Sequence, residues 1–256
     1  MKRCFPLFAS ILVVATLATT ASAASGTLYN LHKKPWTSYG EYAPNYNICT
    51  SCGGGVTYSL TYGISSPTQS GNSTKFHLGG STPYSDALFT KSVIGHSNSL
   101  VPDPNHTIVP NLHNFTYDVY FFGGNLSLSQ VLEFDISMYF GGHSLIFGTQ
   151  CRVAGGHAWD IWDNPNSHWV SAKAPCYPIS NGWNHLTIQV QRTSTGNKLV
   201  FKTITLNGKT STINRTYGPN SAPKSWYGVT VNFQMDGNKK QSPYSVYLDK
   251  FTFKYW

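Results

Sequence analysis

Residues 132–140 alternate strictly between apolar and polar side chains. The even positions are all apolar, and the odd positions are Glu133, Asp135, Ser137 and Tyr139. Successive side chains of a β-strand point to opposite faces, whereas an amphipathic helix repeats about every 3.6 residues. The segment is therefore predicted to be a strand that buries one face and presents two carboxylates, a hydroxyl and a phenol on the other.

Similar short segments follow one another along the chain, separated by Gly, Pro and Asn. The clearest are residues 56–62, 74–78, 115–122, 186–192, 198–206, 229–235 and 244–256. Residues 87–94 fit either a strand or a short helical turn. Asn207-Gly208 is a hairpin signal, and the apolar positions change phase near Asp249-Lys250, which predicts a bulge. Many short strands without a helical period or a long repeat predict an all-β sandwich or barrel.

The N-terminus has the features of an export signal. A short basic start precedes an apolar run, and Ala21-Ser-Ala23 fits a cleavage site. The run is too short to span a bilayer comfortably, so no membrane insertion is expected. We expect residues 1–23 to be a signal peptide and residues 24–256 to form one secreted domain, in which residues 24–55 are an irregular lead.

Four cysteines follow the predicted signal peptide. An even number in an exported protein indicates disulfides. Proximity along the chain favours Cys49–Cys52 and Cys151–Cys176, although four cysteines allow three pairings. The Cys49–Cys52 spacing also occurs in redox and zinc motifs, but no second ligand pair and no βαβ pattern accompany it. A structural clip is the preferred interpretation.

The chain carries a formal net charge of +8, and its basic residues are scattered. Nucleic-acid-binding proteins usually cluster Lys and Arg, so nucleic acid is not expected as a partner. An attraction to acidic polysaccharides or acidic surfaces fits the net charge. Only 11% of the residues are charged and 14% are aromatic, which suits short strands better than amphipathic helices.

Several later segments resemble the concanavalin A-like jelly rolls, the superfamily of lectins and glucanases. They are Trp183-Asn-His-Leu-Thr-Ile-Gln189, Ile204-Thr-Leu-Asn-Gly-Lys209 and Val246-Tyr-Leu-Asp-Lys-Phe251, and the resemblance covers roughly residues 115–256. It implies a two-sheet antiparallel β-sandwich in which a concave sheet commonly holds a glycan. The Glu-Phe-Asp-Ile, Gly-Thr-Gln-Cys, Trp-Asp-Ile-Trp-Asp and Asp-Gly-Asn blocks also resemble a group of secreted bacterial proteins, which implies fold and export but no particular reaction.

By analogy with these jelly rolls, the open face of residues 131–140 would line a glycan groove. The expected ligand-binding residues are Glu133, Asp135, Ser137, Tyr139, Asn232, Gln234, Gln189 and Trp162, with Gln191, Trp159 and Trp169 as further candidates. Planar polar groups can hydrogen-bond sugar hydroxyls, and aromatic rings can pack against sugar C–H faces. The alternative is that the polar side chains only form the solvated outer face of a sandwich.

A polysaccharide-degrading enzyme is the main functional alternative. Glycoside hydrolases need two carboxyl groups about 5–10 Å apart, and the origins of Glu133 and Asp135 on one strand are separated by roughly 7 Å. One family of laminarinase-like jelly rolls carries Glu-x-Asp-x-x-Glu, and here the last position is Met138. By parity Met138 faces the core, so the second catalytic carboxylate of that pattern is missing.

A polysaccharide lyase would instead abstract a proton beside a uronic acid carboxylate. Tyr139 and His143, with His157, Arg152 and Gln150, could supply such a set. The Arg-rich and Gln-Ile-His signatures of jelly-roll alginate lyases are absent, which argues against this reaction.

Asp160 and Asp163 lie close together in the sequence, next to an Asn and a Pro. Oxygen ligands at this spacing could hold Ca²⁺, but there is no EF-hand pattern, and Asp163 can equally start a turn. No cofactor is predicted, with Ca²⁺ as the alternative. The sequence thus predicts a secreted sandwich that binds a polysaccharide or cell-surface glycan. A hydrolase or lyase is the second hypothesis, and a structural or adhesive surface protein is the third.

Overall fold

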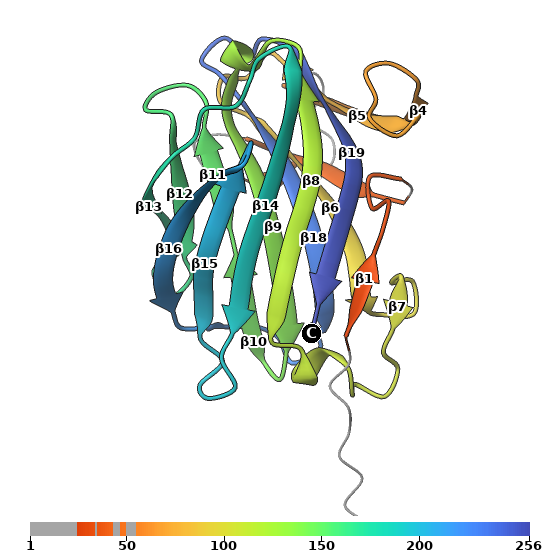
Figure 1. The fold of residues 1–256 in the computed structure, drawn as a ribbon, viewed down its shortest axis with the longest axis vertical. Coiled ribbons are helices and arrows are strands. Elements are labelled where there is room, and N and C mark those ends of the chain that lie inside the picture. The colour runs from red at the N-terminus through yellow and green to blue at the C-terminus, as the bar shows by residue number, and fades with distance from the viewer. Residues whose placement is uncertain (1–24, 34, 43–46, 50–54) are drawn as a thin grey trace, which may run out of the picture.

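Two β-sheets pack face to face in the computed structural model, which describes residues 25–33, 35–42, 47–49 and 55–256 (Figure 1). Sheet A has the order β16 (Lys209–Tyr217), β15 (Leu199–Leu206), β14 (Gly182–Arg192), β8 (Asn114–Gly123), β19 (Tyr244–Tyr255), β5 (Ser73–Gly80) and β4 (Val56–Ile64), and β1 (Gly26–Leu28) pairs with β19. Sheet B has the order β13 (His168–Pro175), β12 (Ala158–Asp163), β11 (Thr149–Arg152), β9 (Ser129–Phe140), β18 (Gly228–Gly237), β6 (Asp86–Gly95), β2 (Thr37–Tyr42) and β3 (Asn47–Cys49). β10 (His143–Phe147) joins β9 and β17 (Asn220–Ser221), while β7 (Val101–Pro102) joins β6.

The strand pairs are antiparallel apart from the short β6–β7 pair, so the predicted all-β jelly-roll sandwich is confirmed. The predicted strand segments all form strands, and residues 87–94 lie in β6 rather than in a helical turn. Two 3-10 turns, at Val109–Asn111 and Leu126–Leu128, are the helical elements of the described ranges. None of the helical segments in these ranges is long and apolar enough to cross a membrane.

The apolar faces of the two sheets meet in an aromatic core. Phe134 of β9 lies 5.4 Å from Phe233 of β18 between ring centroids, and Phe233 lies 5.1 Å from Phe76 of sheet A. Each of these rings is at most 1% exposed, and burying a side chain of this size contributes roughly 1.5–3 kcal/mol. The even positions of residues 132–138 all belong to this core, which confirms the parity predicted for β9 and places Met138 inside.

Two predictions of local backbone geometry are also confirmed. Asn207 and Gly208 connect β15 and β16 with φ values of 51° and 79°, the left-handed conformation that a two-residue hairpin turn requires. The register of β19 against β8 shifts between Asp249 and Thr252, and Lys250 adopts a φ of 47° there. This irregularity is the predicted bulge, and it turns Lys250 outward.

Within the described part of residues 24–55, the chain forms three short strands, where an irregular lead was predicted. β1 pairs with the end of β19, and β2 pairs with both β6 and β3. These strands are short, and the pairings of β1 with β19 and of β2 with β6 join residues far apart in sequence, which a local sequence pattern does not reveal. The predicted signal peptide, residues 1–23, and Cys52 of the predicted Cys49–Cys52 clip lie outside the described residues.

The second predicted disulfide is present. Cys151 in β11 and Cys176 just after β13 are bonded, with their Cα atoms 5.8 Å apart. Because β12 pairs with both β11 and β13, the bond closes this end of sheet B across three strands. The bond therefore supports the strands that carry the groove described next.

Candidate functional site

The outer face of sheet B brings together the polar side chains of three neighbouring strands. Glu133 and Asp135 of β9 point away from the core, and each is 7% exposed. On β18, Gln234 lies opposite Glu133 and Asn232 lies opposite Asp135, while Gln150 of β11 lies on the other side of Glu133. The alternation in each strand therefore builds polar rows that run across the sheet.

A groove of about 740 Å³ lies over this part of the face. Its lining includes Glu133, Asp135, Gln150, Gln234, Trp162 and Trp169. The two tryptophans face each other across the β12–β13 pair, with ring centroids 5.1 Å apart and planes at 69°. Gly148 makes room for them, since a Cβ there would lie 2.9 Å from the Cβ of Trp162. The groove thus combines a polar floor with an aromatic wall.

Asp236 also lines the groove, although it was not among the predicted residues. It continues the outer-face row of β18, and Gln234 Nε2 donates a hydrogen bond of 3.0 Å to its Oδ1. The sequence could have indicated it, because Asp236 follows Gln234 by two residues and therefore lies on the same face of the strand. Glu133, Asp135 and Asp236 give this groove an acidic character in an otherwise basic chain.

The carboxyl group of Asp135 has a strongly raised pKa. Its Oδ1 accepts a 2.9 Å hydrogen bond from the backbone N–H of Thr149. Burial raises the pKa of Asp135 to about 7, the Thr149 hydrogen bond opposes this shift, and the negative charge of Asp236 adds to it. Near neutral pH Asp135 therefore exists in both its protonated and ionised forms.

Polar side chains between the groove and the far end of β9 form hydrogen bonds with one another. Asn232 Nδ2 donates a 3.1 Å hydrogen bond to the Ser137 hydroxyl. The Thr90 hydroxyl of β6 donates one of 2.7 Å to Asn232 Oδ1. Ser137 is only 3% exposed, so this middle stretch forms a flat, polar continuation of the groove floor.

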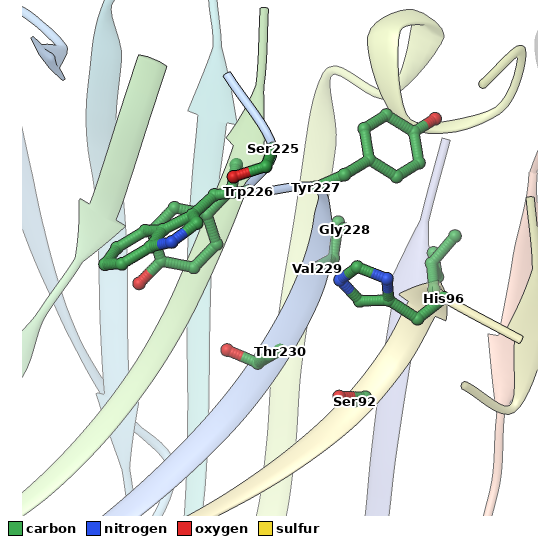
Figure 2. A pocket seen from close by; sticks show the side chains of 10 residues that line it. Ser92, His96, Ser225, Trp226, Tyr227, Gly228, Val229 and Thr230 are labelled. Atoms are coloured by element: carbon green, nitrogen blue, oxygen red, sulfur yellow. The ribbon is translucent and has the colours of Figure 1, made fainter. Parts of the chain in front are cut away.

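The far end of β9 borders a second hollow of about 390 Å³. Here Tyr139 packs edge-on against Trp226, with ring centroids 5.3 Å apart. Figure 2 shows Trp226 and His96 on either side of this hollow, with Thr230 and Ser92 on the strands below them. Trp226 is 51% exposed, and it was missed because it lies in a loop without periodicity.

The loop that carries Trp226 is anchored by its neighbour Tyr227. The Tyr227 hydroxyl donates a hydrogen bond to Asp103, and the ring of His106 stacks on Tyr227 with centroids 3.7 Å apart. Burial tends to raise the pKa of Asp103, but hydrogen bonds from Tyr227 and from the backbone N–H groups of residues 107–109 outweigh it and hold the pKa below its usual value. An ionised Asp103 thus fixes one wall of the second hollow.

Some of the residues that were predicted to contact a glycan lie elsewhere. Gln189 and Gln191 are in β14 of sheet A, and the exposed Gln189 accepts a hydrogen bond from Thr203 on that sheet's outer face. Alternation predicts the face of a strand but not its sheet, so their assignment to the groove was wrong. Trp159 is 1% exposed and belongs to the core, whereas Trp162 and Trp169 line the groove.

The residues proposed for a lyase are not brought together. Tyr139 lies opposite Ser144, whereas His143 lies opposite Phe140, so the side chains of Tyr139 and His143 point to opposite faces. His157 stacks on Tyr177, with ring centroids 5.2 Å apart, rather than approaching Tyr139. The prediction that Tyr139 and His143 act together in catalysis is therefore wrong.

The two calcium candidates engage separate protein partners. Asp160 accepts a 2.9 Å hydrogen bond from Gln150 Nε2 and pairs with Arg152 Nε at 2.9 Å. Asp163 accepts hydrogen bonds from the backbone and side-chain nitrogens of Asn166, at 3.3 and 3.0 Å, as expected of a turn-starting residue. In the part of the chain that the structure describes, no three His, Cys, Asp or Glu side chains gather as a metal site.

No protein-family model and no curated protein matches the chain. Among solved structures, the alginate lyase vAL-1 from a Chlorella virus is similar with a TM-score of 0.44 and 13% identity, over 79% of this chain and 92% of that one. A family 11 carbohydrate-binding module from Clostridium thermocellum has a TM-score of 0.38 and 13% identity, over 91% and 96%. Against a carbohydrate-binding module of the β-sandwich superfamily the TM-score is 0.38 at 9% identity, and 84% of this chain spans 55% of that chain.

Proposed function

We propose that the protein is secreted and binds a polysaccharide or cell-surface glycan on the outer face of sheet B without cleaving it. The observation that carries this proposal is the groove of about 740 Å³, which joins a floor of carboxylate and amide groups to a wall formed by Trp162 and Trp169. Sugar rings have hydroxyls at their edges and C–H groups on their faces. A concave site with a few convergent polar groups and aromatic surface suits such a ligand.

The length of the face favours a polymer over a single sugar. One hollow contains Glu133 and the other contains Tyr139, and both residues lie on the same side of β9. Six residues of strand span roughly 20 Å. Trp226 at the far end and Trp162 at the near end provide aromatic surface at both limits of this distance.

The charge of the groove favours a neutral glycan. Glu133, Asp135 and Asp236 contribute carboxyl groups, and the cation in the lining, Arg152, is paired with Asp160. Carboxylates held in a concave site repel a polyanion more strongly than they would in open water. A chain of neutral sugars can donate its hydroxyls to the same groups without this penalty.

A glycoside hydrolase is a second candidate, favoured by one observation. With the pKa of Asp135 at about 7, a protonated carboxyl group is present at neutral pH two residues from Glu133. A general acid in glycoside hydrolysis must carry such a proton. One observation argues against a hydrolase. The last acidic position of the laminarinase-like pattern is Met138, which has no carboxylate and is fully buried.

The expected result for Trp162→Ala is a rise of about tenfold or more in the dissociation constant for the glycan that the wild-type protein retains, because aromatic anchors dominate binding. Retention on a panel of insoluble neutral polysaccharides, followed by titration with soluble fragments, measures it. Tyr29→Ala is the matched control, since Tyr29 is 70% exposed and distant from the groove in sequence and strand order. Equal affinity of Trp162→Ala and wild type would contradict the proposal.

Product analysis on the same panel separates the alternatives. New reducing ends that disappear in Glu133→Gln and Asp135→Asn would replace the binding proposal with hydrolysis. If the protein neither is retained on any glycan nor releases a product, the remaining hypothesis is a structural or adhesive surface protein.

A further inference from the structure

The outer face of sheet A, on the opposite side of the sandwich, carries aromatic side chains across its central strands. Trp183 of β14, Phe122 of β8 and Tyr247 of β19 lie opposite one another in register. Phe122 is 5.7 Å from Trp183 and 6.1 Å from Tyr247 between ring centroids. All three are half-buried, and Figure 1 looks onto the strands that hold them.

A second row extends this surface by two rings. Tyr120 and His185 stack with centroids 4.2 Å apart and planes at 4°. His185 Nε2 lies 3.1 Å from the Asp118 carboxylate, which also accepts a 2.6 Å hydrogen bond from the Thr187 hydroxyl. Asp118 thus holds the imidazole flat against Tyr120. The rings of Trp183, Phe122, Tyr247, Tyr120 and His185 are called the aromatic strip below.

Lysines border the aromatic strip. The bulge in β19 places Lys250 Nζ over the Tyr120 ring, 5.5 Å from its centroid. Lys75 of β5 continues the first aromatic row beyond Tyr247, and Lys254 is exposed further along β19. The described strands of sheet A contain two acidic residues. Asp118 is paired with His185, and Asp249 is fully buried.

We propose that the aromatic strip and its lysines form a second binding surface, which takes an anionic polysaccharide. Sugar rings would stack on Trp183 and Tyr247, while carboxylate or sulfate groups of the chain would pair with Lys250 and its neighbours. This proposal does not depend on the function of the groove.

Charge complementarity selects this occupant. The sheet A face presents lysines, whereas the groove on sheet B presents Glu133, Asp135 and Asp236, so a polyanion is attracted to one side and repelled from the other. Single-stranded nucleic acid also combines planar rings with negative charge. The lysines here are separated rather than clustered, which favours a polysaccharide with charges spaced along a stacked chain.

The test uses the full chain after export and polygalacturonate fragments as the probe, with affinity measured by calorimetry. Trp183→Ala is expected to weaken binding by about tenfold or more. Lys250→Ala is expected to weaken it severalfold and to flatten its decline with salt, because exposed charge pairs are screened. Trp162→Ala in the groove is the matched control and is expected to bind polygalacturonate like wild type.

Several outcomes overturn the proposal. Unchanged polygalacturonate binding in both Trp183→Ala and Lys250→Ala removes the aromatic strip as a site. A loss of binding in Trp162→Ala, with Trp183→Ala unaffected, moves the anionic chain to the groove. Binding of an oligo(dT) probe at Trp183 with no binding of polygalacturonate assigns the surface to nucleic acid instead. By contrast, neutral-glycan binding that fails while polygalacturonate binding persists would support the second surface and overturn only the function proposed for the groove.

Discussion

Replacing Asp249 by alanine is expected to lower the free energy of unfolding by about 2–4 kcal/mol, because hydrogen bonds to a charged group contribute more than those between neutral groups. Asp249 is fully buried next to the bulge of β19. Its carboxylate accepts hydrogen bonds from the Thr68 hydroxyl at 2.8 Å, from the backbone N–H groups of Gln69 and Ser70 at 2.6 and 3.0 Å, and from that of Lys250 at 2.7 Å. Alanine leaves these donors without their acceptor, which costs more than the loss of an average hydrogen bond.

The difference in stability between wild type and Asp249→Ala is expected to become smaller in acid. Burial tends to raise the pKa of Asp249, but hydrogen bonds from Ser70, Gln69, Thr68 and Lys250 outweigh it and hold the pKa below its usual value. A carboxyl group with a lowered folded-state pKa stabilises above its unfolded pKa, and that stabilisation is lost as the pH falls through the folded value. The gap between wild type and Asp249→Ala should therefore narrow below about pH 4.

Urea unfolding at pH 7 and pH 3 measures both effects. Asp118→Ala is the matched control, because Asp118 is a partly exposed carboxylate in the same sheet, and it is expected to change stability by at most about 1 kcal/mol. A similarly small effect of Asp249→Ala at pH 7, or a gap that stays constant in acid, would contradict the role assigned to this carboxylate.

Features that depend on a few consecutive residues could be predicted from the sequence. The two-residue turn at Asn207-Gly208, the bulge beside Asp249 and the core-facing side of β9 are properties of local backbone geometry. The same parity placed Glu133 and Asp135 on the outer face. Strand alternation thus predicted which side chains of this strand lie on the outer face of the sheet.

Features that depend on strand partners could not be predicted in this way. Gln189 has the same alternation as Gln234, but β14 belongs to sheet A and β18 to sheet B. β1 and β2 are defined by pairing with β19 and β6, more than 40 residues away in sequence. Trp226 joins Tyr139 only because Tyr227 anchors its loop to Asp103. Sheet membership and loop placement are long-range properties, whereas alternation reports only two faces of one strand.

Asp135→Asn is expected to raise the free energy of unfolding at pH 8 and to leave it within about 1 kcal/mol of wild type at pH 4. Burial raises the pKa of Asp135 from 3.8 to about 7, so the folded protein keeps a proton that the unfolded chain has already released. Stability conferred by this proton is complete below the unfolded pKa and is lost as the pH rises through the folded one. The full difference is on the order of 4 kcal/mol at most. Denaturant unfolding across pH 4–8 measures it.

Asparagine is suited to this test because it stays neutral at every pH, and its Oδ1 can still accept the hydrogen bond from Thr149. A groove evolved only for stability would carry such a neutral amide. A carboxyl group that destabilises the fold once it ionises is typical of a functional site, where stability is exchanged for an interaction with a ligand. Asp135→Asn should therefore be more stable than wild type at pH 8 and bind its glycan more weakly. Greater stability with unchanged glycan affinity would show that Asp135 does not contact the ligand.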